Sequence, residues 1–303
     1  MVLKRVCCLL FAASLAGLSG HALAADMPMP AKAPVVAPAL ETWSFSLTPY
    51  AWLTALNGSS TVRGRTTNLD ASFVDILNNT QFPKGLFQLA AFGEARYGRW
   101  AVLLDAAYMK MALGRSLMAS RTVDDVNAGV GAGLGLTMEM VIVEAALAYE
   151  VARWNGLTAP GSTTAFDVYA GARTWWQRGK LDLALSGSVN TADLTLTAER
   201  NLSAEANVSW VDPVVGARIR HQFAPRWDLV VSGDIGGFGA GSKFSWQAIG
   251  ALAYEVSRSK SVSWSGMLGY KALSVDYSKG SGLSHYEFDM VIHGPILGLV
   301  ARF

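Results

Sequence analysis

The last third of the chain alternates apolar and polar side chains in five consecutive segments between residues 210 and 303. Side chains that alternate in this way point to opposite faces of a β-strand, so each segment has one apolar and one polar face. Of the 303 residues 51% are hydrophobic. Beyond the N-terminus, however, no uninterrupted apolar run reaches the roughly eighteen residues that a membrane helix requires. The chain is therefore predicted to use strands to shield its apolar surface from water.

Five further segments upstream show the same alternation, at residues 42–56, 86–97, 100–108, 136–151 and 165–175. Strands cannot cross a lipid layer as an open sheet, because the amide groups along its two edges would have no hydrogen-bond partners. A closed antiparallel sheet has no edges, and its outer face can be apolar while its inner face is polar. We therefore predict an all-β chain that forms a closed antiparallel transmembrane β-barrel of about ten strands, with about eight or twelve as the alternatives.

The weaker segments leave the strand number open. Residues 181–185 and 194–198 predict a hairpin that either belongs to the barrel or projects from it. Residues 59–85 and 113–130 are predicted to be long loops, the first with a short helix at residues 73–77 and room for one extra strand. Asn57-Gly58 is a turn signal at the end of the first strand.

The predicted connections alternate between short and long. Gly98-Arg99, Ala224-Pro225 and residues 257–260 are short turns, and they lie at the same end of the barrel as Phe303. Outer-membrane barrels have short periplasmic turns and longer extracellular loops, so we expect the Phe303 end to be periplasmic. Aromatic side chains stand beside these turns, as expected for a girdle at the membrane interface.

The N-terminus has the features of a signal peptide at residues 1–24. Lys4 and Arg5 precede an apolar stretch at residues 6–18, and Ala22-Leu23-Ala24 has the small-x-small form of a cleavage site. The mature chain is predicted to begin at Ala25. Residues 25–41 are rich in proline and alanine and are predicted to form a periplasmic linker, and residues 42–303 the barrel.

Both cysteines, Cys7 and Cys8, lie in the predicted signal peptide. The mature chain would therefore have no disulfide, no thiol nucleophile and no cysteine metal ligand. The formal net charge is only +2, which does not indicate a nucleic-acid partner.

The last predicted strand, residues 286–303, changes phase at Gly294-Pro295. Above this dipeptide the outward set is predicted to be Phe288, Met290 and Ile292. Below it the outward set is Leu297, Leu299, Ala301 and Phe303. A shift of one residue requires a bulge, and proline is tolerated in a strand at such a position. This interpretation turns His293 toward the lumen.

The inward face of the predicted barrel is heavily charged. Ionised groups in a narrow lumen need partners or water, so these side chains are expected either to form a network of ion pairs or to line a charged constriction. The acidic members of the predicted network are Glu94, Asp105, Glu144, Asp167, Asp212 and Asp234, joined by Asp228 and Glu255. The basic members are Arg96, Arg173, Arg218, Arg220 and Lys271, joined by Arg302.

Several motifs resemble those of a proteobacterial outer-membrane β-barrel family, porin-like, whose members are largely of unassigned function. The resemblance covers residues 42–303 and is strongest after residue 210. It rests on residues 210–216 (WVDPVVG), residues 233–239 (GDIGGFG), Trp246-Gln247, Gly269-Tyr270, Gly294-Pro295 and the terminal Phe303. It implies the outer membrane of a Gram-negative bacterium and outer-membrane lipid as the surroundings. It also implies that the barrel-assembly machinery reads Leu299, Ala301 and Phe303 at the end of the last strand.

The sequence gives little support for catalysis. The predicted mature chain has three histidines, His221, His285 and His293, and only Ser284-His285 with Glu287 forms a local cluster. No histidine pair has metal-ligand spacing, and no cofactor motif is present. We expect a non-enzymatic protein with a structural or surface role and an ion-paired lumen. The alternatives are a porin-like channel for small solutes and, third, a lipid-modifying enzyme.

Overall fold

The computed structural model describes residues 42–62, 65–74, 86–123, 126–190 and 195–303. The predicted signal peptide (1–24) and linker (25–41) lie outside the described residues. Within the described ranges, no helix is long and apolar enough to cross a membrane.

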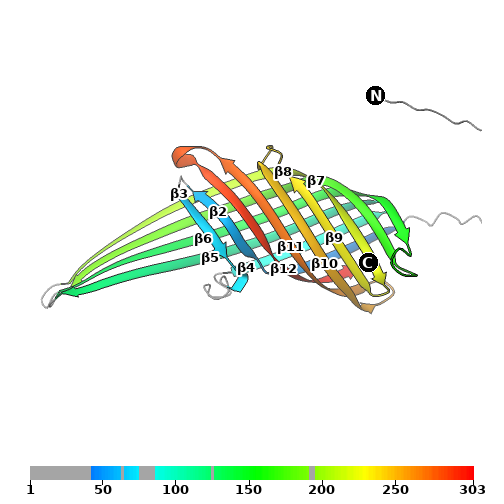
Figure 1. The fold of residues 1–303 in the computed structure, drawn as a ribbon, viewed down its shortest axis with the longest axis horizontal. Coiled ribbons are helices and arrows are strands. Elements are labelled where there is room, and N and C mark those ends of the chain that lie inside the picture. Colours follow the sequence, from blue (N-terminus) through cyan, green and yellow to red (C-terminus); the bar gives the residue numbers. More distant parts are fainter. Residues whose placement is uncertain (1–41, 63–64, 75–85, 124–125, 191–194) are drawn as a thin grey trace, which may run out of the picture. The chain divides into compact units, whose positions relative to one another are not determined.

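The described chain consists almost entirely of strands that pair antiparallel (Figure 1). The strands are β1 (Trp43–Trp52), β2 (Ala55–Val62), β3 (Arg65–Ala71), β4 (Leu86–Tyr97), β5 (Trp100–Val123), β6 (Val126–Asn155), β7 (Thr163–Asn190), β8 (Thr195–Ala224), β9 (Trp227–Gly236), β10 (Phe244–Arg258), β11 (Ser263–Lys279) and β12 (Tyr286–Arg302). One 3₁₀ turn, Gly282–Ser284, precedes β12.

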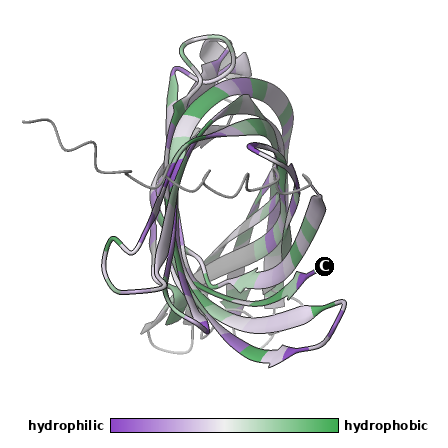
Figure 2. Cartoon of the chain, turned by 90° about the vertical axis from the view of Figure 1, so that its right-hand side faces the viewer, coloured by the Kyte–Doolittle hydropathy of each residue, from purple (hydrophilic) through white to green (hydrophobic). Residues whose placement is uncertain are grey.

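Strands β1 and β4 to β12 form a closed ring, which confirms the predicted barrel of ten strands. Each strand pairs with the next, and β1 closes the ring against β12, where Leu47 is opposite Ala301 and Trp52 is opposite Ile296. Around the ring each strand hydrogen-bonds to two neighbouring strands over at least part of its length. Figure 2 shows the ring from the end that carries Phe303, which we call the C-terminal end; the opposite end is the distal end.

The outer face of the ring is apolar. Along β9 the outward residues Trp227, Leu229 and Val231 are exposed, whereas the intervening residues are more buried. Aromatic pairs stand beside the turns of the C-terminal end, as predicted: Trp43 with Tyr97, Trp100 with Tyr149, and Trp227 with Tyr254, with ring centroids 5.2, 4.8 and 4.7 Å apart. An exposed apolar surface of this kind suits a barrel whose outside meets lipid.

The predicted bulge at Gly294-Pro295 is wrong. β12 pairs with β11 in one unbroken register, from Ser263 opposite Arg302 to Lys279 opposite Tyr286. The side chains of Phe288, Met290 and Ile292 consequently point inward and are fully buried. The prediction failed because it assumed a polar inner face throughout, whereas the inner face of the distal half is apolar.

The irregularity lies instead in the neighbouring strand. β1 ends at Trp52, and β2 continues from Ala55 in the same register along β12. A Cβ at Gly294 would overlap the carbonyl oxygen of Leu53, which lies between the two strands. Gly294 therefore permits the close approach at the seam of the barrel.

The first predicted long loop is partly a hairpin. Asn57-Gly58 is not a turn but a part of β2, where Asn57 is opposite Val291. β2 turns into β3, and the pair lies beside β12 without joining the ring of ten. Phe73 and Val74 are helical, and the rest of the helix predicted at residues 73–77 lies outside the described residues.

Strands β5 to β8 extend far beyond the rest of the barrel at the distal end (Figure 1). We call this four-stranded extension the blade; it comprises residues 112–123, 126–137, 180–190 and 195–205. The predicted loop at 113–130 is therefore wrong, and the hairpin predicted within 179–209 is the tip of β7 and β8. Each arm of about twelve residues reaches about 40 Å. Alternate glycines at positions 129, 131, 133 and 135 gave the sequence a loop-like composition, yet all four pair within the sheet.

The seam at Gly294 generates a stability prediction. We expect Gly294→Ala to lower the free energy of unfolding by about 1–3 kcal/mol, because the added methyl group displaces the backbone of β1 from β12. Gly266→Ala, on the adjacent strand β11, is the control, since a Cβ there meets open space. Urea unfolding in detergent micelles, followed by tryptophan fluorescence, measures both variants; equal stabilities would contradict this role for Gly294.

The blade generates a second prediction. Replacing residues 112–137 and residues 180–205 each by Asn-Gly joins directly opposite partners, Met111 to Met138 and Gly179 to Ala206. We expect this shortened chain to fold into a barrel that still changes gel mobility on heating, because the strand pairs removed lie within the blade. As a control, replacing residues 276–289 by Asn-Gly shortens the β11–β12 hairpin, removes Phe288 from the interior and is expected to destabilise the barrel. Folding failure of the first variant alone would contradict the independence of the blade.

Candidate functional site: the interior of the barrel

The C-terminal half of the lumen holds a network of arginines and carboxylates, which we call the lower network. Its members are Glu94, Arg96, Glu150, Arg153, Asp167, Arg218 and Arg220. The carboxylate of Asp167 is fully buried and accepts hydrogen bonds from three arginines: Arg96 (3.1 Å), Arg218 (2.8 Å) and Arg220 (2.9 Å). Four cations face three carboxylates, so the lower network carries one positive charge in excess.

The lower network joins opposite walls of the ring. Arg218 on β8 donates to Glu94 on β4 at 2.8 Å, and Arg96 on β4 reaches Asp167 on β7. Glu150 on β6 accepts from Arg153 (2.7 Å) and Arg220 (2.8 Å). Glu150 is a member of the lower network that was not among the members of the predicted network.

A second cluster surrounds Arg173 nearer the middle of the barrel. Its guanidinium is completely buried and donates to Glu144 at 2.6 Å and to Asp234 at 2.7 Å. Tyr169 donates its hydroxyl to Asp234 at 3.2 Å. The Tyr169 ring lies over Gly216 of β8, where any Cβ would collide with it. The small residue at position 216 thus gives Tyr169 room to reach Asp234.

A third group of ionic contacts surrounds Lys271, whose side chain reaches across the lumen. Its ammonium group on β11 pairs with Asp105 on β5 at 2.5 Å and donates to the hydroxyl of Tyr50 at 3.0 Å. The same ammonium lies 5.0 Å from the ring centroid of Trp52, a cation–π contact. Lys271 therefore lies at the boundary between the charged half and the apolar half of the lumen.

Asp212 differs from the other predicted members because it has no ion pair among the described residues. Its carboxylate is buried and accepts hydrogen bonds from the backbone N–H of Ser242 (2.6 Å) and from the Trp210 indole (3.2 Å). Asp212 thus fixes the glycine-rich turn between β9 and β10, whose chain reverses through positive φ angles at Gly237 and Gly239. Its role is to hold this turn in place.

The structure brings thirteen of the fourteen predicted inward charges into ionic contacts, all except Asp212; those away from the C-terminal turns are Glu94, Arg96, Asp105, Glu144, Asp167, Arg173, Arg218, Arg220, Asp234 and Lys271. At the C-terminal end, Arg302 pairs with Asp228 at 2.8 Å and Arg258 pairs with Glu255 at 2.5 Å. Ionic side chains thus extend from the C-terminal turns to the middle of the barrel.

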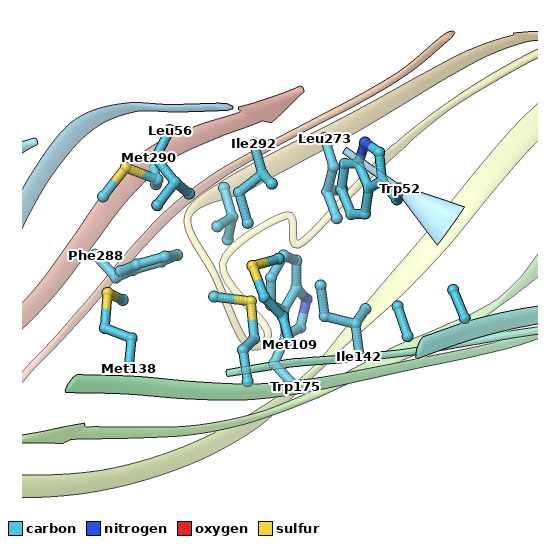
Figure 3. Close-up of a cluster of buried hydrophobic side chains, with 14 of the residues drawn as sticks. Trp52, Leu56, Met109, Met138, Ile142, Trp175, Leu273, Phe288, Met290 and Ile292 are labelled. Carbon is cyan, nitrogen blue, oxygen red and sulfur yellow. The ribbon is translucent and has the colours of Figure 1, made fainter. Parts of the chain in front are cut away.

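The distal half of the lumen is filled by apolar side chains, which we call the apolar layer (Figure 3). Trp52, Leu273 and Ile292 project from one wall toward Met109 and Ile142 on the other. Further members are Leu56, Met138, Trp175, Phe288 and Met290. Together these side chains form one hydrophobic cluster inside the described part of the barrel.

Three stacked aromatic rings form one part of the apolar layer. The Trp175 and Trp210 rings are nearly parallel, with centroids 5.3 Å apart, and Tyr277 stacks on Trp210 at 3.9 Å. The Tyr286 hydroxyl donates to Gln177 at 2.8 Å. These residues come from β7, β8, β11 and β12, so the aromatic contacts bridge the ring as the ion pairs do.

A cavity of about 550 Å³ lies in the C-terminal half of the lumen. Tyr50, Lys271 and Gln247 bound it toward the apolar layer, and Arg226, Arg258 and Phe303 mark its C-terminal end. The lower network and the small residues of β9 to β12 form its walls.

The histidines do not form a catalytic arrangement in the described structure. Ser284 donates its hydroxyl to the Ser281 carbonyl oxygen at 2.8 Å, so it is not activated by His285, which lies 3.5 Å from Glu287. His293 faces outward, contrary to expectation, and contacts Tyr270 at 2.6 Å and Asn57 at 2.7 Å. No cluster of metal-ligating side chains occurs among the described residues.

The burial of Arg173 generates a prediction. Arg173→Met leaves two carboxylates unpaired in the interior, so we expect it to lower the free energy of unfolding by about 3–5 kcal/mol. Adding Glu144→Gln and Asp234→Asn should restore most of that loss. Arg178→Met, on the exposed outer face, is the control and should have no measurable effect. Urea unfolding measures all four chains, and equal stability of the single and triple variants would contradict the electrostatic explanation.

No protein-family model and no curated protein matches the sequence. Similar solved structures include Ail, the attachment invasion locus protein of Yersinia pestis, at 12% identity, covering 87% of this chain and 99% of that chain, with a TM-score of 0.27. A Pseudomonas aeruginosa FadL homologue matches at 8% identity, covering 87% and 90%, with a TM-score of 0.29. The translocator domain of the autotransporter NalP from Neisseria meningitidis matches at 8%, covering 86% and 89%, with a TM-score of 0.26. At TM-scores this low the likenesses carry no inference about function, and the fold rests on the strand pairing of this chain.

Proposed function

We propose that this chain is an integral outer-membrane β-barrel protein of a Gram-negative bacterium, with the C-terminal end in the periplasm. The apolar outer face supports this, because exposed residues such as Val215, Ile235 and Leu297 would otherwise face water. The aromatic pairs beside the C-terminal turns support a membrane interface at that level. The blade would then project outside the cell.

The barrel has a non-enzymatic, structural or surface role, and its lumen does not conduct solutes. The apolar layer is the observation that carries this proposal. Trp52, Trp175 and Phe288 are fully buried within it, and no water-filled path could pass such packing without rearrangement. Ion pairs across the lumen, from β4 to β8 and from β5 to β11, hold the walls together beneath it.

The last strand provides a surface for the barrel-assembly machinery. Leu299 and Phe303 point outward and are about half exposed, whereas Ala301 between them is buried. Phe303 closes the seam through backbone hydrogen bonds with Phe45 of 2.9 and 3.3 Å. An assembly factor that bound this strand before closure would therefore be released when β1 takes its place.

A porin-like channel for small solutes is the second candidate. The cavity of about 550 Å³ favours it, because its lining is rich in charged side chains, as in a selectivity region. For conduction the apolar layer would have to open. Methionines 109, 138 and 290 are its most adaptable members, since their unbranched side chains can repack.

Planar-bilayer recording separates the two candidates. We expect the wild-type protein to give no stable conductance steps, and a Trp52→Ala, Phe288→Ala variant to give steps because it removes two side chains that close the lumen. A Val215→Ala, Ile235→Ala variant, altered only on the outer face, is the matched control and should remain silent. Heat-dependent gel mobility verifies folding. Uniform steps from the wild-type protein would contradict the closed barrel and support the channel.

A further inference from the structure

The cavity in the C-terminal half of the lumen has features that a purely structural barrel does not require. Its volume of about 550 Å³ lies within the range of small-molecule sites. It is closed toward the distal end, where Tyr50 and Lys271 are joined to Asp105. Turn residues such as Pro225 and Arg226 line its other end, so a ligand would enter from the C-terminal end.

The two walls of the cavity differ in chemistry. One wall is the lower network, with Arg96, Arg218 and Arg220 facing the cavity from β4 and β8. Between Lys271 at its distal limit and Glu255, Arg258 and Arg302 at its C-terminal end, the facing wall presents small or apolar side chains from β10 to β12, namely Ile249, Ala251, Ala253, Met267 and Val300. A ligand that fills the cavity therefore meets guanidinium groups on one side and an apolar surface on the other.

The lining of the cavity is richer in cations than in carboxylates. Five of its side chains are acidic and eight are basic, the latter being Arg96, Arg153, Arg218, Arg220, Arg226, Arg258, Lys271 and Arg302. Arg96 lines the cavity and is about nine-tenths buried; its Nη1 lies 3.5 Å from a carboxylate oxygen of Glu150 and forms no hydrogen bond within the described chain. At the C-terminal end Arg226 is exposed and forms no ion pair within the described chain.

We infer that this cavity binds a small amphipathic anion, an organic phosphate, sulfonate or carboxylate with an apolar body. The anionic group accepts hydrogen bonds from arginines of the lower network, which offsets the positive charge of the cavity lining. The apolar body packs against Ala251, Ala253 and Met267. A free inorganic anion would use only the first of these contacts, and an organic cation would use only the second.

Isothermal titration of the full chain in lipid nanodiscs tests this inference, with phenyl phosphate as the probe. We expect phenyl phosphate to bind at least tenfold more tightly than inorganic phosphate or phenyltrimethylammonium. Arg226→Gln should weaken phenyl phosphate binding about threefold, because it removes a cation at the entrance. Arg178→Gln, on the outer face, should leave the affinity unchanged.

Variants that fill the cavity provide a second test of the binding inference. Ser232→Trp places an indole inside the cavity and should abolish binding of phenyl phosphate, and Val230→Trp from the same wall serves if the first variant does not fold. Val231→Trp on the same strand faces outward and is the matched control. Equal affinity for phenyl phosphate and phenyltrimethylammonium, or unchanged binding in a folded cavity-filling variant, would overturn the inference. Equal affinity for phenyl phosphate and inorganic phosphate would also overturn it.

Discussion

A ring of ten strands is narrow enough for side chains from opposite walls to meet, and this constraint organises the whole interior. Every inward residue must either find a partner across the lumen or face a cavity. In the C-terminal half the partners are ionic, as with Arg218 and Glu94 between β8 and β4. In the distal half they are apolar, as with Met109 and Ile142 facing Ile292 and Leu273. The lumen is consequently divided into two layers with different chemistry.

The boundary between the layers is formed by one residue with both kinds of contact. Lys271 neutralises Asp105 while its ammonium lies against the ring of Trp52. This arrangement explains how a charged half can adjoin an apolar half without an unpaired ion between them. The strands of the blade keep the same inward and outward faces beyond the ring. Leu183 and Leu202, which are directly opposite each other, continue the inward face, whereas Lys180 and Glu205 lie on the outer face.

Much of this fold could be predicted from alternation alone. The ring of ten, the turns at Gly98-Arg99 and Ala224-Pro225, and the outward aromatic residues follow from a period of two residues and the need to close the sheet. The alternation around Asp167 and Arg173 likewise placed their side chains inside, but it could not give the pairing, because partners such as Arg218 and Glu94 are distant in sequence. Glu150 also lay on the inner face, and only the structure shows it between two arginines.

The failures have one common physical origin. A polar inner face along the whole height of the barrel would turn Phe288, Met290 and Ile292 outward and require a bulge at Gly294-Pro295, whereas the inner face of the distal half is apolar. In the distal part of β12 the alternation is clear but inverted: the apolar set faces inward, and Glu287, Asp289 and His293 occupy outward positions. The blade parts of β5 and β6 failed for a related reason, since polar residues in β5 and alternate glycines in β6 weakened the pattern that marks a strand.

Cysteine accessibility tests the division of the lumen most directly, in a chain whose Cys7 and Cys8 are replaced by serine. A single cysteine at Ser232 lies in the cavity of the charged half, and one at Ile292 lies within the apolar layer. A charged, water-soluble maleimide should modify the first rapidly in the folded barrel and the second only after denaturation. Rapid modification of Ile292→Cys in the folded protein would show that water fills the distal half and would contradict the closed, two-layered lumen.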